Sequence, residues 1–283
     1  MDKVLLSFGH GYSAQALARR LLPQGWRVIG TTRDPATAAR LAEEGVEPLL
    51  WGANVSAALA AATHLLASVA PLEEGDPVLA RYRSAIAEAA PGLRWAGYLS
   101  TTGVYGDHQG GWVDEETPLT PATRRGQLRV VAEAEWRAIP GLPLHVFRLA
   151  GIYGPGRGPF EKLRQGTARR IVKPGQVFSR IHVADIAQVL AASIARPRPG
   201  AVYNLCDDAP APPEEVIAHA AQLLGLPLPE AVPWDEADLS PMARSFYAES
   251  KRVSNRRIKE ELGVRLHHPD YRSGLAALLA EGD

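Results

Sequence analysis

The sequence predicts an α/β fold in which helices cover both faces of a doubly wound parallel sheet, followed by a smaller C-terminal lobe. In the first half, short apolar runs alternate with longer amphipathic stretches, and a glycine-rich turn directly follows the first run. After Gly154 the stretch GPGRGPF concentrates glycine and proline, and the regular alternation weakens. The strands expected from the apolar runs span residues 4–8, 27–31, 46–50, 64–68, 95–101 and 144–149.

The stretches between these runs have the spacing of amphipathic helices. In the first stretch, Ala14, Leu17, Ala18, Leu21 and Leu22 form one apolar stripe. Each such helix should make a right-handed crossover between parallel strands. Further helices are expected at 35–44, 77–89, 125–137, 181–195, 213–224, 254–262 and 271–279, and a late strand at 201–205.

The composition excludes several classes of partner. The 31 basic and 31 acidic residues balance, whereas nucleic-acid-binding modules usually have a basic excess. Cys206 is the only cysteine, which excludes an intrachain disulfide and fits a reducing compartment. The apolar run in MDKVLLSFGHGYSAQ is too short for a signal peptide or a membrane span. We therefore expect a cytoplasmic protein with a small-molecule substrate and no nucleic-acid or membrane partner, and we keep a homodimer open.

The first strand leads directly into Gly9-His10-Gly11-Tyr12-Ser13-Ala14, a GxGxxA pattern that opens the first helix. The first glycine would allow a tight turn, the second would let a pyrophosphate approach the backbone, and the alanine would keep the helix close to the strand. With a strand before it and a helix after it, the pattern predicts a Rossmann fold that binds a nicotinamide dinucleotide. The alternative is a glycine turn without a ligand. The candidate cofactor contacts in this loop are Gly9, Gly11, Tyr12, Ser13 and Ala14.

The end of the second strand indicates which dinucleotide is bound. An NAD-binding fold usually has Asp or Glu here, but this sequence has Thr32 and Arg33, and Asp34 follows only at the next helix. A guanidinium beside a hydroxyl suits the 2′-phosphate of NADP, so NADP is favoured over NAD. The alternative is an ordinary solvated arginine. Ser68 and Ala70, where the fourth strand ends, are further candidate cofactor contacts.

The pattern divides the chain into two parts. Residues 1–155 would form the dinucleotide-binding Rossmann domain, and residues 181–205 would return to it. Residues 156–180 and 206–283 would form the smaller substrate-binding lobe.

Several segments together resemble a known superfamily. They are STTGVYGD at 100–107, RLAGIYGPGR at 148–157, RIHVADIA at 180–187, VYNLCDD at 202–208 and KRVSNRRIKEELG at 251–263. In this order they resemble the extended short-chain dehydrogenase/reductase superfamily, in particular its NAD-dependent epimerase/dehydratase group. The glycine loop, which is GxGxxA rather than GxxGxxG, is more similar to the atypical branches.

The resemblance implies a catalytic Ser or Thr at the end of the fifth strand, and a Tyr-x-x-x-Lys pair on the next helix that exchanges the proton. Thr101 matches the hydroxyl position, with Thr102 beside it, although strand-end hydroxyls often only bond to local backbone. The Tyr-x-x-x-Lys pair is missing. Arg125 stands at the tyrosine position and Arg129 at the lysine position. Arginine cannot exchange a proton near neutral pH, but Arg129 could hold ribose or phosphate.

Two further features bear on activity. His108, on a glycine-rich loop after the fifth strand, is a candidate substitute acid, or else a solvated loop residue. Between Gly154 and Ile181, seven basic residues face one acid, which suits an anionic, nucleotide-sugar-like substrate, or else forms a solvated face. The eight histidines show no metal-binding spacing, so no metal site is expected.

The sequence thus predicts an NADP(H)-binding oxidoreductase or epimerase-like protein that acts on a small anionic substrate. The alternative is a catalytically silent NAD(P)-binding redox sensor or interaction protein that lost its tyrosine.

Overall fold

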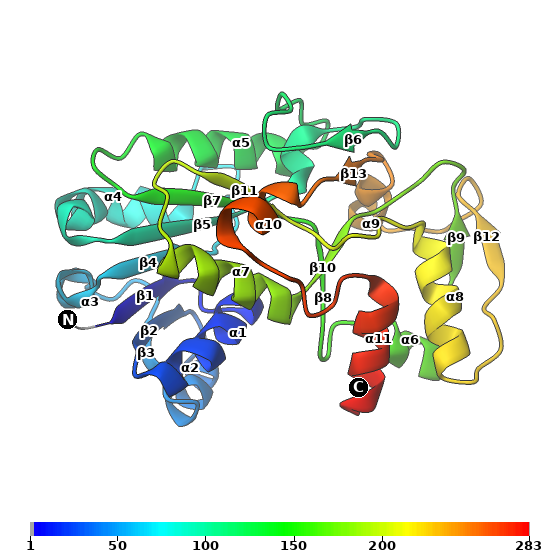
Figure 1. The fold of residues 1–283 in the computed structure, drawn as a ribbon, viewed down its shortest axis with the longest axis horizontal. Helices are drawn as coiled ribbons and strands as arrows, with labels where there is room; N and C mark the ends of the chain where they lie inside the picture. The colour runs from blue at the N-terminus through cyan, green and yellow to red at the C-terminus, as the bar shows by residue number, and fades with distance from the viewer. Residues whose placement is uncertain (1–2, 283) are drawn as a thin grey trace.

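The computed structural model describes residues 3–282, and its centre is a seven-stranded parallel sheet with the strand order β11-β7-β5-β4-β1-β2-β3 (Figure 1). This confirms the predicted Rossmann-type α/β fold, and the expected strands are present to within one or two residues. The strands of this sheet are β1 (Val4–Phe8), β2 (Arg27–Thr32), β3 (Glu47–Leu50), β4 (His64–Ala67), β5 (Trp95–Thr101), β7 (Leu144–Leu149) and β11 (Val202–Leu205).

The position of β1 determines where a ligand can bind. β1 pairs with β2 on one side and with β4 on the other, so the chain reverses its direction across the sheet at this strand. In parallel sheets, ligands bind beyond the carboxyl ends of the strands at such a switch point. The glycine loop after β1, Ser68 after β4 and Thr101 at the end of β5 all lie at this edge.

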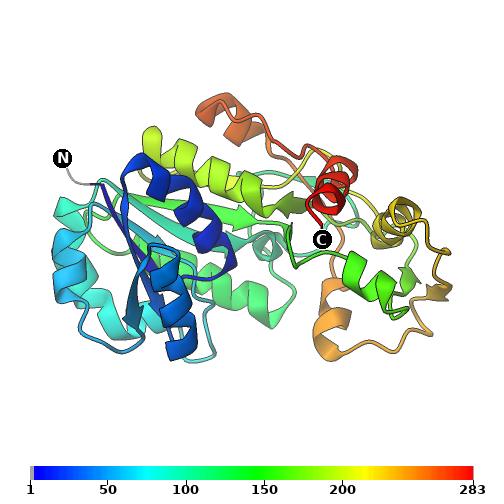
Figure 2. The same cartoon turned by 90° about the horizontal axis from the view of Figure 1, so that it is seen from below.

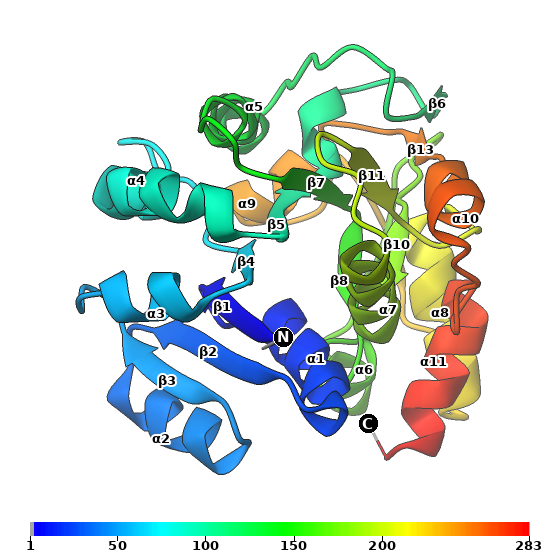
Figure 3. The ribbon, with the colours of Figure 1, turned by 60° about the vertical axis from the view of Figure 1, so that its left-hand side comes forward.

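Two helical layers cover the sheet, and each layer has its own apolar core (Figure 3). One core contains residues of α1 (Tyr12–Leu21), α2 (Pro35–Glu43), α7 (Val183–Ala195) and α10 (Arg256–Leu262). The other core contains residues of α3 (Ser56–Ala61), α4 (Pro77–Ala89) and α5 (Arg124–Arg137). Short 3₁₀ helices at Leu22–Gln24, Ala90–Gly92 and Thr102–Tyr105 follow α1, α4 and β5.

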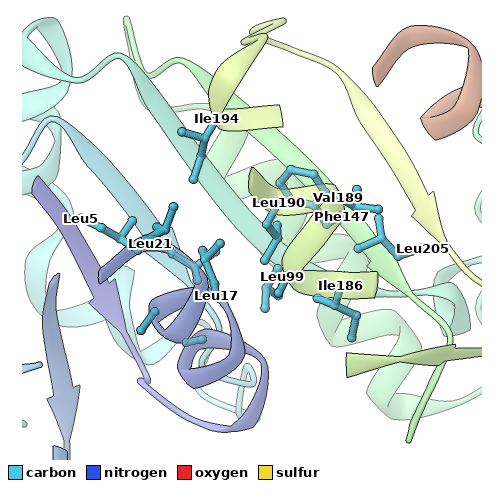
Figure 4. Close-up of a cluster of buried hydrophobic side chains, with 14 of the residues drawn as sticks. Leu5, Leu17, Leu21, Leu99, Phe147, Ile186, Val189, Leu190, Ile194 and Leu205 are labelled. Atoms are coloured by element: carbon cyan, nitrogen blue, oxygen red, sulfur yellow. The ribbon is translucent and has the colours of Figure 1, made fainter. Parts of the chain in front are cut away.

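The first core fixes the start of α1 against the sheet. Leu17 and Leu21 of α1 and Leu190 of α7 are fully or almost fully buried over the sheet (Figure 4). Burying one such side chain contributes roughly 1.5–3 kcal/mol. The helix that follows the glycine loop is therefore held by packing along its length, and its first turn is free to face a ligand.

The C-terminal elements gather beyond one end of the sheet around a smaller core (Figures 1 and 2). Tyr153, Phe160, Tyr271 and Leu278 belong to this core. The elements of this part are β8 (Gly151–Tyr153), α6 (Phe160–Arg164), β9 (Arg170–Val172), β10 (Arg180–His182), α8 (Pro213–Leu223), β12 (Ala231–Pro233), α9 (Pro241–Phe246) and α11 (Tyr271–Ala280). A two-stranded pair, β6 (Trp112–Val113) with β13 (Arg252–Val253), connects it to the loop after β5.

The structure corrects the helix expected at 181–195. Ile181 and His182 belong to β10, which pairs with β8, and the helix begins only at Val183. The His182 side chain accepts a hydrogen bond from the backbone N–H of Ala184 and so caps the helix. Apolar residues on both sides of this boundary hide it from a periodicity argument. Helix α3 and the two- and three-residue strands were also not predicted.

Two negative findings apply to residues 3–282, the part of the chain that the structure describes. No helix in this part has the length and apolar character that a membrane span requires. No group of three or more His, Cys, Asp or Glu side chains in this part is arranged to hold a metal ion.

Candidate functional site

Two cavities meet at the glycine loop, at the sheet edge where β1 and β4 end. The larger has a volume of about 740 Å³ and the smaller about 530 Å³. Gly9 and Gly11 line both, so the loop lies between two adjacent spaces. The larger space extends along the ends of β5 and β7 to the C-terminal part, and the smaller lies over the end of β2.

The two glycines of the loop have different roles. Gly9 has a φ of 75°, and a Cβ atom added to it would lie 2.7 Å from Cγ2 of Val69, so only glycine fits. Its N–H donates to Oγ1 of Thr31 at 2.8 Å. A Cβ atom added to Gly11 would meet nothing nearer than the Gly9 carbonyl oxygen, 3.9 Å away. A larger residue at position 11 would therefore extend into open space where a ligand would approach the backbone.

The first turn of α1 is suited to an anion. Gly11 is its N-cap and provides no side-chain cap, and the first turn contains no acidic residue. The N–H groups and the helix dipole therefore favour negative charge at this point. Ser13 lines the larger cavity, and buried Ala14 lets the helix pack closely. These features fit the pyrophosphate of a dinucleotide.

Tyr12 connects the loop to the segment after β8. Its hydroxyl donates to the Pro155 carbonyl at 3.0 Å, and the guanidinium carbon of Arg157 lies 5.4 Å from its ring centroid. A Cβ atom on Gly154 would lie 2.5 Å from the Tyr12 hydroxyl, so this close approach requires a glycine. Arg157 also lines the larger cavity, which places a cation beside the start of α1.

The smaller cavity contains the predicted specificity residues. Thr32, Arg33 and Ala70 line it, together with Trp51. Asp34, the only acid next to Arg33, caps α2 through its carboxylate. It accepts hydrogen bonds from the backbone N–H of Ala36 at 3.3 Å and of Thr37 at 2.8 Å, and from the Thr37 hydroxyl at 2.6 Å. The bonds from Thr37 and Ala36 hold the pKa of Asp34 below its usual range. This carboxylate therefore caps α2, and it does not take the place of the acid that binds the ribose in NAD-specific folds.

At the end of β5, Thr101, Thr102 and Arg129 all line the larger cavity. Oγ1 of Thr101 accepts a hydrogen bond from the Gly103 N–H at 3.2 Å, which is the local role considered for it, and its own proton can still be donated. Arg129 donates from Nη1 to the Leu99 carbonyl at 2.6 Å and to the Tyr98 hydroxyl at 3.2 Å. The Arg129 side chain thus links α5 to β5 through two hydrogen bonds.

Arg125, at the tyrosine position, also lines the larger cavity. Its guanidinium carbon lies 4.3 Å from the ring centroid of Phe246, a residue of α9. The first turn of α5 therefore contacts the C-terminal part, and the cavity wall at this point is cationic and aromatic.

A second wall of the larger cavity comes from residues that the sequence did not single out. Nζ of Lys251 donates to Oε2 of Glu249 and to the Gly106 carbonyl, both at 2.6 Å. Both side chains are buried and line the cavity, and Oε1 of Glu249 has no hydrogen-bond partner among the described residues. Tyr247 lies beside them, and its burial raises the pKa of its phenol. Lys251 begins the segment KRVSNRRIKEELG, but the sequence assigned no role to it or to Glu249, so only the fold reveals the group.

The remaining predicted residues are dispersed. Ser68 lines the larger cavity and donates to the Gly9 carbonyl. His108 is in neither of the two cavity linings; its Nε2 lies 3.1 Å from the Tyr105 carbonyl oxygen. Of the seven basic residues between 154 and 181, only Arg157 and Arg180 line the larger cavity.

Comparisons with known proteins agree with this arrangement. No protein-family model matches the sequence. Protein YeeZ of Escherichia coli (strain K12) is 30% identical over 289 residues, which cover 95% of this chain and 97% of that protein. A conserved protein of unknown function from Silicibacter pomeroyi is 66% identical, with a TM-score of 0.96 over 99% of both chains. A proposed NAD-dependent epimerase/dehydratase from Methylobacillus flagellatus is 29% identical, with a TM-score of 0.71 over 99% of this chain and 98% of that one.

Two structures below 25% identity share the fold alone. Human epimerase family protein SDR39U1, solved with NADPH, is 18% identical, with a TM-score of 0.76 over 99% of this chain and 98% of that one. A UDP-glucose 4-epimerase from Stenotrophomonas maltophila, solved with NAD, is 18% identical, with a TM-score of 0.75 over 99% and 97%.

The fold and the site together define a Rossmann-type protein in which a smaller C-terminal part lies beyond one end of the central sheet. The chain belongs to the NAD-dependent epimerase/dehydratase-like group of the extended short-chain dehydrogenase/reductase superfamily, and it is an atypical member without the Tyr-x-x-x-Lys pair.

Proposed function

We propose that the protein binds NADP(H) across the two cavities and acts as an oxidoreductase or epimerase-like enzyme on a small anionic substrate. The observation that carries this proposal is the pair of adjacent cavities that share Gly9 and Gly11 in their linings. The adenosine half of the cofactor would occupy the smaller cavity and the pyrophosphate the start of α1. The nicotinamide half would enter the larger cavity beside Thr101.

The preference for NADP(H) rests on two residues. Arg33 lines the smaller cavity and is exposed, so its guanidinium is available to a 2′-phosphate. The carboxylate of Asp34, which could otherwise favour a ribose hydroxyl, is engaged as the cap of α2. The structure of SDR39U1 with NADPH and that of the epimerase with NAD show that this fold accepts either cofactor. The choice therefore depends on local residues such as these two.

An anionic substrate follows from the charges around the larger cavity. Its lining includes four arginines and Lys251, against Glu249 as the acidic residue. Lys251 is balanced by Glu249, and Arg129 and Arg180 are bonded to backbone carbonyls, which leaves Arg125 and Arg157 at the surface of the cavity. A sugar nucleotide or another phosphate-bearing carbonyl compound fits this excess of positive charge.

The bound nicotinamide would supply or accept a hydride. In the reducing direction the substrate carbonyl oxygen needs a proton, and we assign this proton to Nζ of Lys251, which faces the same cavity as Thr101. Thr101 would donate a hydrogen bond to the same oxygen, and Glu249 would hold the ammonium in place. Lys251 would then recover its proton from solvent.

The test is NADPH and NADH titration of the purified protein, followed by NADPH oxidation with a panel of keto-sugar nucleotides and small phosphorylated carbonyl compounds. We expect NADPH to bind more tightly than NADH and at least one anionic carbonyl compound to be reduced. Tighter binding of NADH would refute the cofactor assignment.

The second candidate is a silent NADP(H)-binding protein. Arg125 and Arg129 favour it, because their contacts with Phe246 and Leu99 are structural and neither can exchange a proton. Tight NADPH binding without turnover of any panel compound would establish this second function in place of the first.

A further inference from the structure

His10, between the two glycines of the loop, lines the smaller cavity but was not among the residues expected to bind the cofactor. Its side chain is buried, with 3% of its surface exposed. Neither Nδ1 nor Nε2 has a hydrogen-bond partner among the described residues. Buried polar groups are nearly always paired, so two unpaired nitrogens on one ring beside a cavity indicate a missing partner.

The strand beneath the ring leaves space for it. A Cβ atom added to Gly30 of β2 would lie 2.6 Å from Cγ of His10 and 3.0 Å from its Nδ1. The backbone of His10 is fixed in the same place, since its N–H donates to the Thr31 carbonyl at 2.9 Å. The imidazole therefore lies over the end of β2, next to Thr31 and Thr32, which line the same cavity. The imidazole can lie here only because residue 30 is a glycine.

We propose that His10 is a specificity residue that donates a ring N–H hydrogen bond to the 2′-phosphate of the bound NADP(H). The inference rests on the proposed function and deepens it, because it adds to solvent-exposed Arg33 a second contact from a buried ring in the lining of the same cavity.

The chemistry of the ring suits this role. Burial, and then the charge of Arg19, lower the pKa of His10 to about 4, so the imidazole is neutral near neutral pH. A neutral imidazole has one N–H donor and one acceptor. It can therefore pair with a phosphate oxygen without an additional buried positive charge. Arg33 supplies charge at the entrance, and His10 supplies a directed hydrogen bond inside.

The test uses four proteins: the parent, His10→Ala, Gly30→Ala, and the double variant. Each is titrated with NADPH and NADH by fluorescence, and with adenosine 2′,5′-bisphosphate and ADP by calorimetry. A hydrogen bond to a charged group corresponds to about ten- to a hundredfold in affinity. We expect His10→Ala to lose this much affinity for NADPH and the bisphosphate, with NADH and ADP nearly unchanged.

Gly30→Ala should have the same effect, because the added methyl group displaces the ring. The double variant separates a ligand contact from a packing role. In it, the methyl group of residue 30 fills the space that the imidazole leaves. If the ring only packs, the double variant regains the parent affinity for NADPH; if the ring contacts the phosphate, affinity stays low.

Several outcomes would overturn the proposal: unchanged NADPH affinity in His10→Ala, equal losses for NADPH and NADH, or recovery in the double variant. Thermal unfolding identifies a variant that fails to fold, and the remaining variants then decide the question. A parent protein that does not bind NADPH at all would refute the proposed function, and this inference with it.

Discussion

The glycine loop after β1 and the first turn of α5 line the same cavity, but they differ in what they retain. The loop has the tight turn at Gly9, the open approach at Gly11 and an uncapped helix start. At α5, in contrast, the positions of the acid–base pair are held by Arg125 and Arg129, and both are engaged in contacts that stabilise the fold. The chain therefore keeps the features of a dinucleotide site in the loop but has no acid–base pair on α5, and we expect cofactor binding and proton transfer to depend on separate parts of this fold.

The largest expected effect tests the loop. Gly11→Val should abolish NADPH binding, because the side chain would occupy the space of the pyrophosphate. Loss of two or more charged hydrogen bonds corresponds to more than about a hundredfold in affinity. The fold should survive, since a Cβ atom at this position meets open space. The matched control is Gly92→Val, also a position with open space and far from both linings. NADPH titration with thermal unfolding checks this, and binding by Gly11→Val at the parent affinity would contradict the assignment of the loop.

The next effect tests Lys251, the proton donor that we propose on the other wall of the larger cavity. Lys251→Met should lower turnover by about 10²–10⁴-fold, the usual contribution of a placed acid. NADPH affinity should not change, because Lys251 is assigned to the substrate carbonyl and not to the cofactor. Glu249→Gln should keep the fold but shift the pH profile of turnover, since the ammonium loses its carboxylate partner.

His108→Ala is the comparison variant for this experiment. Since His108 is absent from both linings, we expect its turnover to equal that of the parent. A fall in turnover with His108→Ala, together with an unchanged rate in Lys251→Met, would return the acid role to the histidine predicted from the sequence.

A smaller effect concerns the cofactor alone. Arg33→Ala should weaken NADPH by about ten- to a hundredfold and leave NADH nearly unchanged, because only the 2′-phosphate loses its partner. Arg40→Ala also removes one positive charge, but from α2 and outside the lining of the smaller cavity. It therefore controls for general electrostatic attraction. Equal losses in both variants would mean that net charge, and not a specific contact, determines the preference.

The smallest effect distinguishes the two roles of Arg129. If it fastens α5 to β5, Arg129→Ala should lower stability by about 1–2 kcal/mol and leave NADPH affinity unchanged. For a chain of this size that corresponds to a fall in Tm of about 2–4 °C. Arg124→Ala, on the same helix and paired only with exposed Glu73, should change Tm little. An affinity loss without a change in Tm would show that Arg129 holds the cofactor, which is the role the sequence suggested.

The sequence predicted the parts of this molecule that depend on neighbours along the chain. The strands of the central sheet, the glycine loop and its position before α1 all follow from local periodicity and glycine placement. The boundary at Val183 could not be found in this way, because apolar Ile181 of β10 and apolar Val183 of α7 lie on either side of it and β10 pairs with β8, which is distant in the sequence.

The site residues show the same limit. Thr101 and Arg33 stand at strand ends and could be located from the pattern. Glu249 and Lys251 could not be assigned to the cavity, because Lys251 is held there by a bond to the carbonyl of Gly106, more than a hundred residues away, and Glu249 by its bond to Lys251. His10 was in view but was passed over, because its meaning depends on the missing side chain at Gly30, on the next strand.

The contact between Arg125 and Phe246 affects what it would take to place a Tyr-x-x-x-Lys pair in this chain. A substitution of Arg125 by tyrosine alone would remove a cation–π interaction worth about 0.5–1 kcal/mol at an exposed site. It would provide no working acid, because the lysine position would still be arginine. A Tyr-x-x-x-Lys pair therefore requires changes at both positions, and the change at position 125 has a cost in stability that comes from a residue on α9, in another part of the chain.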